Sequence, residues 1–84
     1  MTVTCLFFAH YQDVVGEHDL TVTVGDDATA RDLALSLQQT YPGLGDLLDQ
    51  GRAAVDAEFA EGDTPLHDGA EVAWMPPMSG GSPR

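Results

Sequence analysis

Lysine is absent from this sequence, and only three arginines offset fourteen aspartate and glutamate residues, so the formal net charge is −11. Proteins that bind nucleic acid neutralise its phosphates with clustered lysine and arginine, and this composition argues against any such partner. The charge instead favours a partner with a basic surface, steered towards this chain by long-range attraction. Two alternatives stay open: a solvated acidic surface that aids solubility, and adaptation to salt, because ten of the fourteen acids are aspartate.

Cysteine and long apolar runs are also scarce. The single cysteine, Cys5, cannot form an internal disulfide and suits a reducing cytoplasm. No apolar run approaches the ~18 residues that a membrane span needs, and the first residues lack the basic and apolar regions of a signal peptide. We therefore expect a cytoplasmic protein with no membrane partner. The 84 residues, 43% of them hydrophobic, predict one domain with a single modest core.

The first half of the chain predicts a hairpin followed by a helix. Residues 2–9 ("TVTCLFFA") and 20–24 ("LTVTV") read as strands, and the turn region between them has room for one helical turn before Gly16. In residues 29–41 the apolar side chains follow helical spacing instead. Thr29 and Asp32 at its start form an imperfect capping box, and Pro42 ends the helix.

The second half predicts a short helical turn within residues 43–51, a third strand over 52–60 and a last strand over 70–75. The order strand, strand, helix, strand, strand predicts an α+β fold with one main amphipathic helix packed on one face of a mixed sheet. This is the layout of a ubiquitin-like β-grasp domain. We place that domain at residues 1–77 and a C-terminal tail at 78–84.

Candidate chemistry within the body of the domain is sparse. Cys5 alternates with core residues on a strand, so we interpret it as a buried structural thiol. The three histidines, His10, His18 and His67, fall in separate turns without ligand spacing, so we expect no metal site.

Three blocks of sequence carry a family resemblance: "LFFA" at 6–9, "AAVD" at 53–56, and "TPLHDGAEVAWMPPMSGG" at 64–81. Their order and spacing over residues 2–81 resemble the MoaD/ThiS sulfur-carrier family, most closely the small subunit of molybdopterin synthase. The most specific part is the last block, with its double proline and Gly-Gly pair. Asp56 and Ala70 depart from the usual residues of these motifs without weakening the resemblance.

The resemblance implies a function for the tail. Gly81 would be adenylated by an E1-like adenylyltransferase (MoeB-like) that uses ATP, and then converted to a thiocarboxylate. The preceding tail residues would carry it into the large subunit (MoaE-like), where the sulfur enters the dithiolene of molybdopterin. These tail residues are Pro76, Pro77, Met78, Ser79 and Gly80. The chain would be the non-catalytic, sulfur-carrying subunit of this sulfurtransferase and would bind no cofactor itself.

The resemblance also implies a partner surface formed by Phe8, Phe59 and Met75, which match apolar contacts of the family's small subunit. Phe8 and Met75 lie on the strand faces opposite the adjacent Phe7 and Trp74. The alternative is a second small core patch covered by residues 42–51.

Ser82, Pro83 and Arg84 follow the glycine pair, whereas the family's working form ends at Gly-Gly. We expect a protease to remove them; the alternative is an added remnant or an end that leaves the protein inactive. Three further functions stay open at this point: a sulfur carrier for thiazole or tRNA thiolation, a ubiquitin-like modifier joined to target lysines, or an interaction module with an inert tail.

Overall fold

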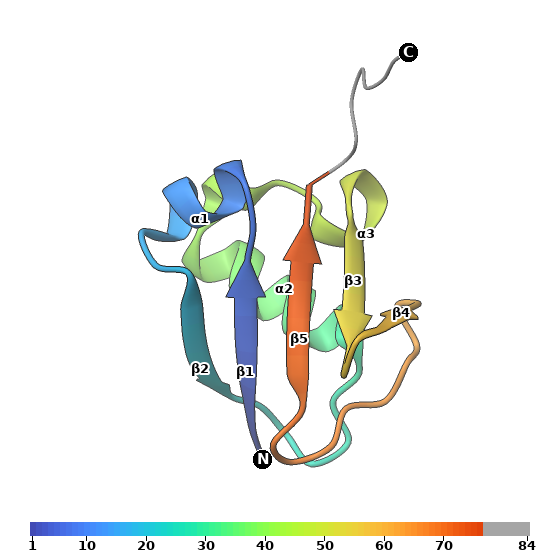
Figure 1. The fold of residues 1–84 in the computed structure, drawn as a ribbon. Helices are drawn as coiled ribbons and strands as arrows, with labels where there is room; N and C mark the ends of the chain where they lie inside the picture. The colour runs from blue at the N-terminus through green and yellow to red at the C-terminus, as the bar shows by residue number, and fades with distance from the viewer. Residues whose placement is uncertain (77–84) are drawn as a thin grey trace.

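A five-stranded mixed sheet forms the frame of the structure, a computed structural model that describes residues 1–76. The strands lie in the order β2-β1-β5-β3-β4, and β1 pairs with β5 in parallel while every other pair is antiparallel (Figure 1). The bounds are β1 Thr2–Phe7, β2 Asp19–Thr23, β3 Arg52–Val55, β4 Glu58–Ala60 and β5 Glu71–Met75. The β1–β2 pairing confirms the predicted hairpin.

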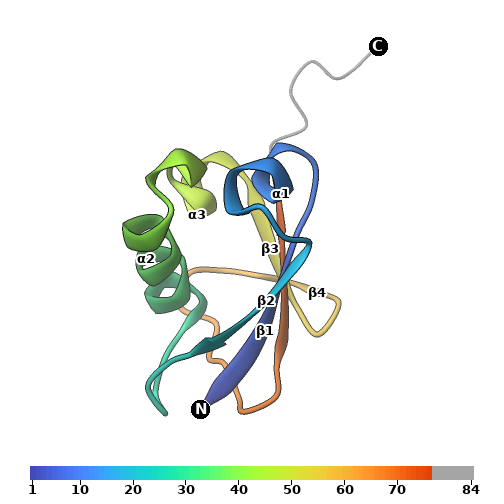
Figure 2. The same ribbon diagram turned by 90° about the vertical axis from the view of Figure 1, so that its left-hand side faces the viewer.

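The main helix, α2 (Ala30–Thr40), covers one face of the sheet together with the short α3 (Leu47–Gln50), as Figure 2 shows. Its start is better capped than the sequence suggested. The Thr29 hydroxyl accepts a hydrogen bond from the Asp32 backbone N–H, and the Asp32 carboxylate accepts one from the Thr29 N–H at 2.9 Å. This reciprocal pair satisfies two N–H groups that the helix itself leaves without partners.

Two further helical pieces complete the fold. Helix α1 (His10–Val15) links β1 to β2 and ends at Gly16, whose φ of 87° is readily adopted only by glycine. The 3₁₀ turn η1 (Pro42–Leu44) follows α2 directly. These elements confirm the predicted helical turn before Gly16 and the helical turns after Pro42.

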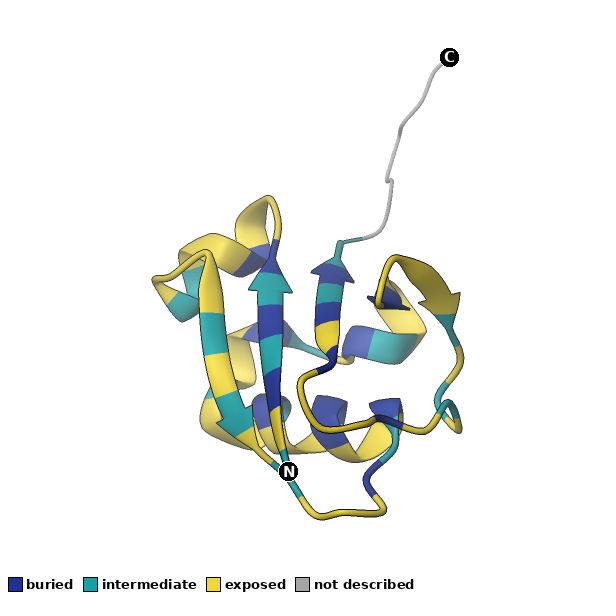
Figure 3. Ribbon diagram, turned by 60° about the horizontal axis from the view of Figure 1, so that its bottom comes forward, coloured by how far each residue is buried: buried dark blue, intermediate teal, exposed yellow. Residues whose placement is uncertain are grey.

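The core lies between the sheet and α2. Burial alternates along β1 and β5, as Figure 3 shows, so that each strand turns one set of side chains towards the helices. Val3, Cys5 and Phe7, which alternate along β1 and share one of its faces, are fully buried. From the apolar side chains of the predicted helix, Leu33, Ala34 and Leu37 belong to the same core cluster, and Ala30 is also buried.

One predicted element is wrong. Residues 52–60 are not a single strand but two, β3 and β4, joined by a tight turn at Asp56 and Ala57, whose φ values are 52° and 72°. Positive φ at both central residues matches the twist of a tight hairpin, although it usually calls for glycine or asparagine. The Asp56 carboxylate stabilises this turn by accepting a hydrogen bond from the Glu71 N–H at 3.0 Å. Phe59 therefore belongs to β4 and not to β3.

The predicted boundary between domain and tail, after residue 77, lies outside the described residues. Among residues 1–76, none of the helices has the length and apolar character needed to cross a membrane.

Candidate functional site

The ends of β1, β5 and β3 lie side by side at one end of the sheet, the end at which the chain continues from β5 towards its C-terminus. Because β1 and β5 are parallel, Phe7 and Trp74 pair near their shared end. Strand β3 runs the opposite way, so its first residue, Arg52, pairs with Met75. The last residues of β1 and β5 and the first residue of β3 therefore lie at one end of the sheet (Figure 1).

A groove of about 720 Å³ opens at this end. We call it the exit groove, because Met75, the last residue of β5, and the following Pro76 line it. It is lined by Phe8, Ala9, Gln50, Gly51, Arg52, Phe59, Met75 and Pro76. The structure thus brings together all three residues of the predicted partner surface, Phe8, Phe59 and Met75, although they come from distant parts of the sequence.

The exit groove is open to solvent. Phe8 is 38% exposed and Phe59 is 70% exposed, and both are large apolar side chains that a monomer normally buries. Residues 42–51 contribute Gln50 and Gly51 to its lining and leave Phe59 uncovered. The alternative of a small second core beneath this segment is therefore wrong. An exposed apolar surface of this kind is typical of a protein-protein contact.

Aromatic contacts position the two phenylalanines. The Phe8 ring meets the His18 ring edge-on, with 5.5 Å between their centroids. The guanidinium carbon of Arg52 lies 5.0 Å from the centre of the Phe59 ring, within the range of a cation–π contact. Arg52 therefore orients Phe59 at the side of the groove.

Gly51 permits the close approach of β3 and β5 beside the groove. A Cβ atom at this position would lie 2.3 Å from the carbonyl oxygen of Met75 and 2.9 Å from the Tyr11 hydroxyl. Any side chain would therefore displace the end of β5. Sequence reasoning missed Gly51 and Arg52, because their importance depends on their closeness to Met75, more than twenty positions away, and no local pattern marks it.

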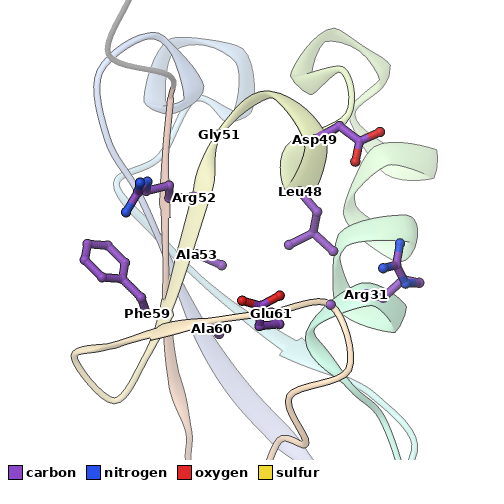
Figure 4. A pocket seen from close by; sticks show the side chains of 10 residues that line it. Arg31, Leu48, Asp49, Gly51, Arg52, Ala53, Phe59, Ala60 and Glu61 are labelled. Carbon is purple, nitrogen blue, oxygen red and sulfur yellow. The ribbon is translucent and has the colours of Figure 1, made fainter.

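A second hollow of about 430 Å³ lies beside the exit groove and shares Gly51, Arg52 and Phe59 with it. In Figure 4, Arg52 and Phe59 lie on one side of β3, and Leu48 and Arg31 on the other. Arg52 and Phe59 thus border both hollows.

The remaining candidate residues, Cys5 and the three histidines, do not line the exit groove. Burial raises the pKa of the Cys5 thiol to about 11, so the thiol stays protonated and unreactive at neutral pH, as expected of a structural cysteine. His10 is in α1, His18 precedes β2 and His67 is in the loop before β5. Within residues 1–76, no three histidine, cysteine or acidic residues gather as a metal site would require.

Of the predicted tail residues, the structure places only Pro76, which lines the exit groove. Pro77, Met78, Ser79, Gly80 and the predicted reactive residue Gly81 lie outside the described residues.

Comparison with known proteins identifies a match to the ThiS family over residues 5–81. The human molybdopterin synthase sulfur carrier subunit is 35% identical, over 94% of this chain and 93% of that protein. Small archaeal modifier protein 3 of Haloferax volcanii is 33% identical, over 96% of this chain and 100% of that protein.

Solved structures share the fold. The crystal structure of SAMP1 from Haloferax volcanii superposes with a TM-score of 0.84 at 27% identity, covering 96% of this chain and all of that one. A chain from the complex of subunits 1 and 2 of the molybdopterin-converting factor from Helicobacter pylori superposes with a TM-score of 0.66 at 26% identity. The match covers 96% of this chain and 100% of that chain. These likenesses confirm the ubiquitin-like β-grasp fold.

Proposed function

This chain belongs to the ThiS family, and we propose that it is a sulfur carrier of molybdenum cofactor biosynthesis, the small subunit of a molybdopterin synthase. The observation that carries the proposal is the position of the exit groove. An exposed apolar surface surrounds the point where β5 ends, and five residues after Pro76 the sequence reaches Gly81, the last residue of the family match. The human relative that bears this name supports the pathway.

The proposed chemistry takes place at the carboxylate of Gly81. A terminal carboxyl group has a pKa of about 3.5, so it is ionised and a poor electrophile at neutral pH. One of its oxygens attacks the α-phosphorus of ATP, and pyrophosphate leaves. A sulfide donor then displaces AMP from the acyl adenylate and leaves a thiocarboxylate. An E1-like adenylyltransferase supplies the ATP site, so this chain needs no cofactor and no catalytic triad of its own.

Delivery of the sulfur requires a tail that is long enough to reach the active site of the partner and narrow enough to enter it. The four residues from Met78 to Gly81 span roughly 13 Å when fully extended. Glycine has no Cβ, so Gly80 and Gly81 can pass through a channel too narrow for other residues. The thiocarboxylate can therefore enter the active site of a large subunit, where its sulfur is transferred to a pterin precursor during dithiolene formation.

Two partners dock on the same surface in this proposal, the large subunit and the adenylyltransferase. The Helicobacter pylori complex of the two subunits supports a large-subunit partner. Both partners must contact the exit groove while the tail enters their active sites, because Met75 and Pro76, which precede the tail, line the groove. The net charge of −11 favours basic surfaces around both active sites.

Processing precedes this chemistry. In the chain as given, the Gly81 carbonyl belongs to the peptide bond with Ser82, so Gly81 has no carboxylate to adenylate. We propose that a cellular protease cleaves after Gly81. The end of the family match at residue 81 supports this position.

A second candidate function is attachment of Gly81 to lysines of other proteins. The 33% identity to small archaeal modifier protein 3 favours it. Adenylation of the terminal glycine would serve that reaction equally well, as it would serve a carrier for thiazole or tRNA thiolation.

Mass spectrometry of the protein isolated from its native cells separates these functions. A sulfur carrier yields a chain that ends at Gly81 with one oxygen replaced by sulfur, and this form accumulates when the large subunit is deleted. A modifier yields branched peptides that join Gly81 to lysines of other proteins. A chain that carries neither change would contradict both proposals.

A further inference from the structure

We infer that Arg52 determines partner specificity at the exit groove by binding a carboxylate of the large subunit. The inference rests on the proposed function, because that function supplies the partner. It adds a polar requirement to an apolar contact: the partner must place an aspartate or glutamate beside the side chain that fills the groove, within a surface that is otherwise basic.

The position of Arg52 is the first argument. Its side chain is exposed and lines the exit groove, so a partner that covers the groove contacts it. Arg52 also pairs directly with Met75, the last residue of β5 (Figure 4 shows the side chain beside β3). Arg52 therefore lies beside the end of β5, where a partner that receives the C-terminal tail must contact the chain.

The surroundings of Arg52 are the second argument. Fourteen acidic residues are present in the chain, yet within residues 1–76 no carboxylate comes within 4.0 Å of the Arg52 guanidinium. Asp49 and Glu61 line the second hollow without pairing with it. The contact that the structure gives the guanidinium is the Phe59 ring at 5.0 Å, and that contact leaves the N–H groups free for another acceptor.

The chemistry of the group defines what it would bind. A guanidinium carries five N–H donors in a planar fork that matches a carboxylate, and it stays charged at every physiological pH. Stacking against Phe59 restricts its motion in advance, which lowers the entropy cost of a bidentate bond. A partner with lysine or arginine at this point would be repelled, even though the rest of the chain attracts it. Arg52 therefore selects against basic surfaces that lack the carboxylate.

Long-range and local electrostatics make opposite predictions for the loss of this arginine. Arg52→Gln makes the chain one unit more negative, so general attraction to a basic partner becomes stronger. The same change removes the proposed ion pair, which weakens binding. Arg31→Gln is the matched control, since it alters the net charge equally but Arg31 lies on α2, on the other side of β3, and lines the second hollow without lining the exit groove (Figure 4).

The experiment measures binding of the large subunit from the same organism to a chain that ends at Gly81, by calorimetry in about 0.15 M salt. We expect Arg52→Gln to raise the Kd at least about tenfold, as for a lost hydrogen bond to a charged group. Arg31→Gln should leave the Kd unchanged or lower it. Arg52→Lys, which keeps the charge but loses the planar fork, should fall between the original chain and Arg52→Gln.

A charge-reversal experiment separates direct binding from a merely structural effect on Phe59. Arg52→Glu should abolish tight binding, and changing one acidic residue of the large subunit to lysine should restore it. Equal Kd values for Arg52→Gln and Arg31→Gln, or no rescue by any acidic-to-lysine change in the large subunit, would overturn the inference alone. If the unaltered chain does not bind the large subunit, the proposed function and this inference both fail.

Discussion

Nε2 of His67 lies 2.5 Å from Oδ2 of Asp56, and this contact ties the turn between β3 and β4 to the loop that precedes β5. The other ring nitrogen of His67, Nδ1, lies 2.8 Å from the carbonyl oxygen of Asp68. Both nitrogens therefore face acceptors, an arrangement that suits the doubly protonated imidazolium. Because β4 carries Phe59, this pair helps to fix one wall of the exit groove.

The pH dependence of this pair is the first prediction. The hydrogen bond to Asp56, and then that to the Asp68 carbonyl, raises the pKa of His67 above its ordinary 6.5. The hydrogen bond from the Glu71 N–H, and then that from His67, lowers the pKa of Asp56 below its ordinary 3.8. The His67 contribution to stability is thus complete below pH 6.5 and lost as the pH rises through the raised pKa. The Asp56 contribution is present above pH 3.8 and lost as the pH falls through the lowered pKa.

NMR titration of the imidazole protons checks this directly, and we expect a His67 pKa above 6.5 that returns towards that value in Asp56→Ala. The difference in Tm between the unaltered chain and His67→Gln should also shrink as the pH rises past the measured pKa. A His67 pKa at or below 6.5 in the unaltered chain would refute the proposed pairing.

The second prediction concerns the apolar contact of the exit groove. Phe59→Asp should weaken binding of the large subunit by about tenfold or more at any salt concentration, since it places a charge where an aromatic anchor is buried on binding. The fold should persist because Phe59 is 70% exposed. Leu35→Asp is the matched control, because Leu35 is 52% exposed but lies on α2, away from the groove. Similar Kd values for the two variants would mean that the groove is not the contact surface.

The third prediction concerns Gly51. A Cβ at this position would lie 2.3 Å from the Met75 carbonyl oxygen, so Gly51→Ala should reduce the free energy of unfolding by roughly 1–3 kcal/mol, as overpacked sites do. Gly25→Ala is the control, since its Cβ would meet no atom within 4 Å and its backbone does not require glycine. Urea denaturation of both variants measures the difference. Equal free energies of unfolding would contradict the prediction and show that β3 and β5 accommodate a Cβ at this point without loss of stability.

The fourth prediction concerns Gly81. In a chain that ends there, Gly81→Val should leave the Tm unchanged, because Gly81 lies beyond the predicted end of the domain at residue 77. It should prevent thiocarboxylate formation, because a β-branched side chain obstructs the narrow approach to the adenylating site. Mass spectrometry after incubation with the activating enzyme, ATP and a sulfide donor measures the loaded fraction. Equal loading of both chains would exclude a channel that requires glycine.

Local patterns in the sequence were sufficient to predict most of the fold. The alternation of Val3, Cys5 and Phe7 and the helical spacing around Leu33 each require only that one face be buried, and the structure buries those faces. The split of β3 from β4 could not be predicted in this way. Its turn at Asp56 and Ala57 lacks the usual glycine and is stabilised by Glu71 and by His67, which follow in the sequence.

The candidate site was predictable only in part. Family resemblance named Phe8, Phe59 and Met75, but nothing local to them shows that they line one groove. Arg52 and Gly51 were missed because their roles arise from the pairing of β3 with β5. A strand pairing between such distant segments is a property of the folded chain and cannot be read from either segment.

The most direct test of the sulfur-carrier account is pyrophosphate release by the activating enzyme with ATP and two purified chains, one ending at Gly81 and one at Arg84. The shorter chain presents the glycine carboxylate and should release pyrophosphate stoichiometrically as its adenylate forms. The longer chain should release none, because its free carboxylate belongs to Arg84, up to about 10 Å further along an extended chain. Comparable release from the longer chain, with its mass unchanged by cleavage, would contradict the account.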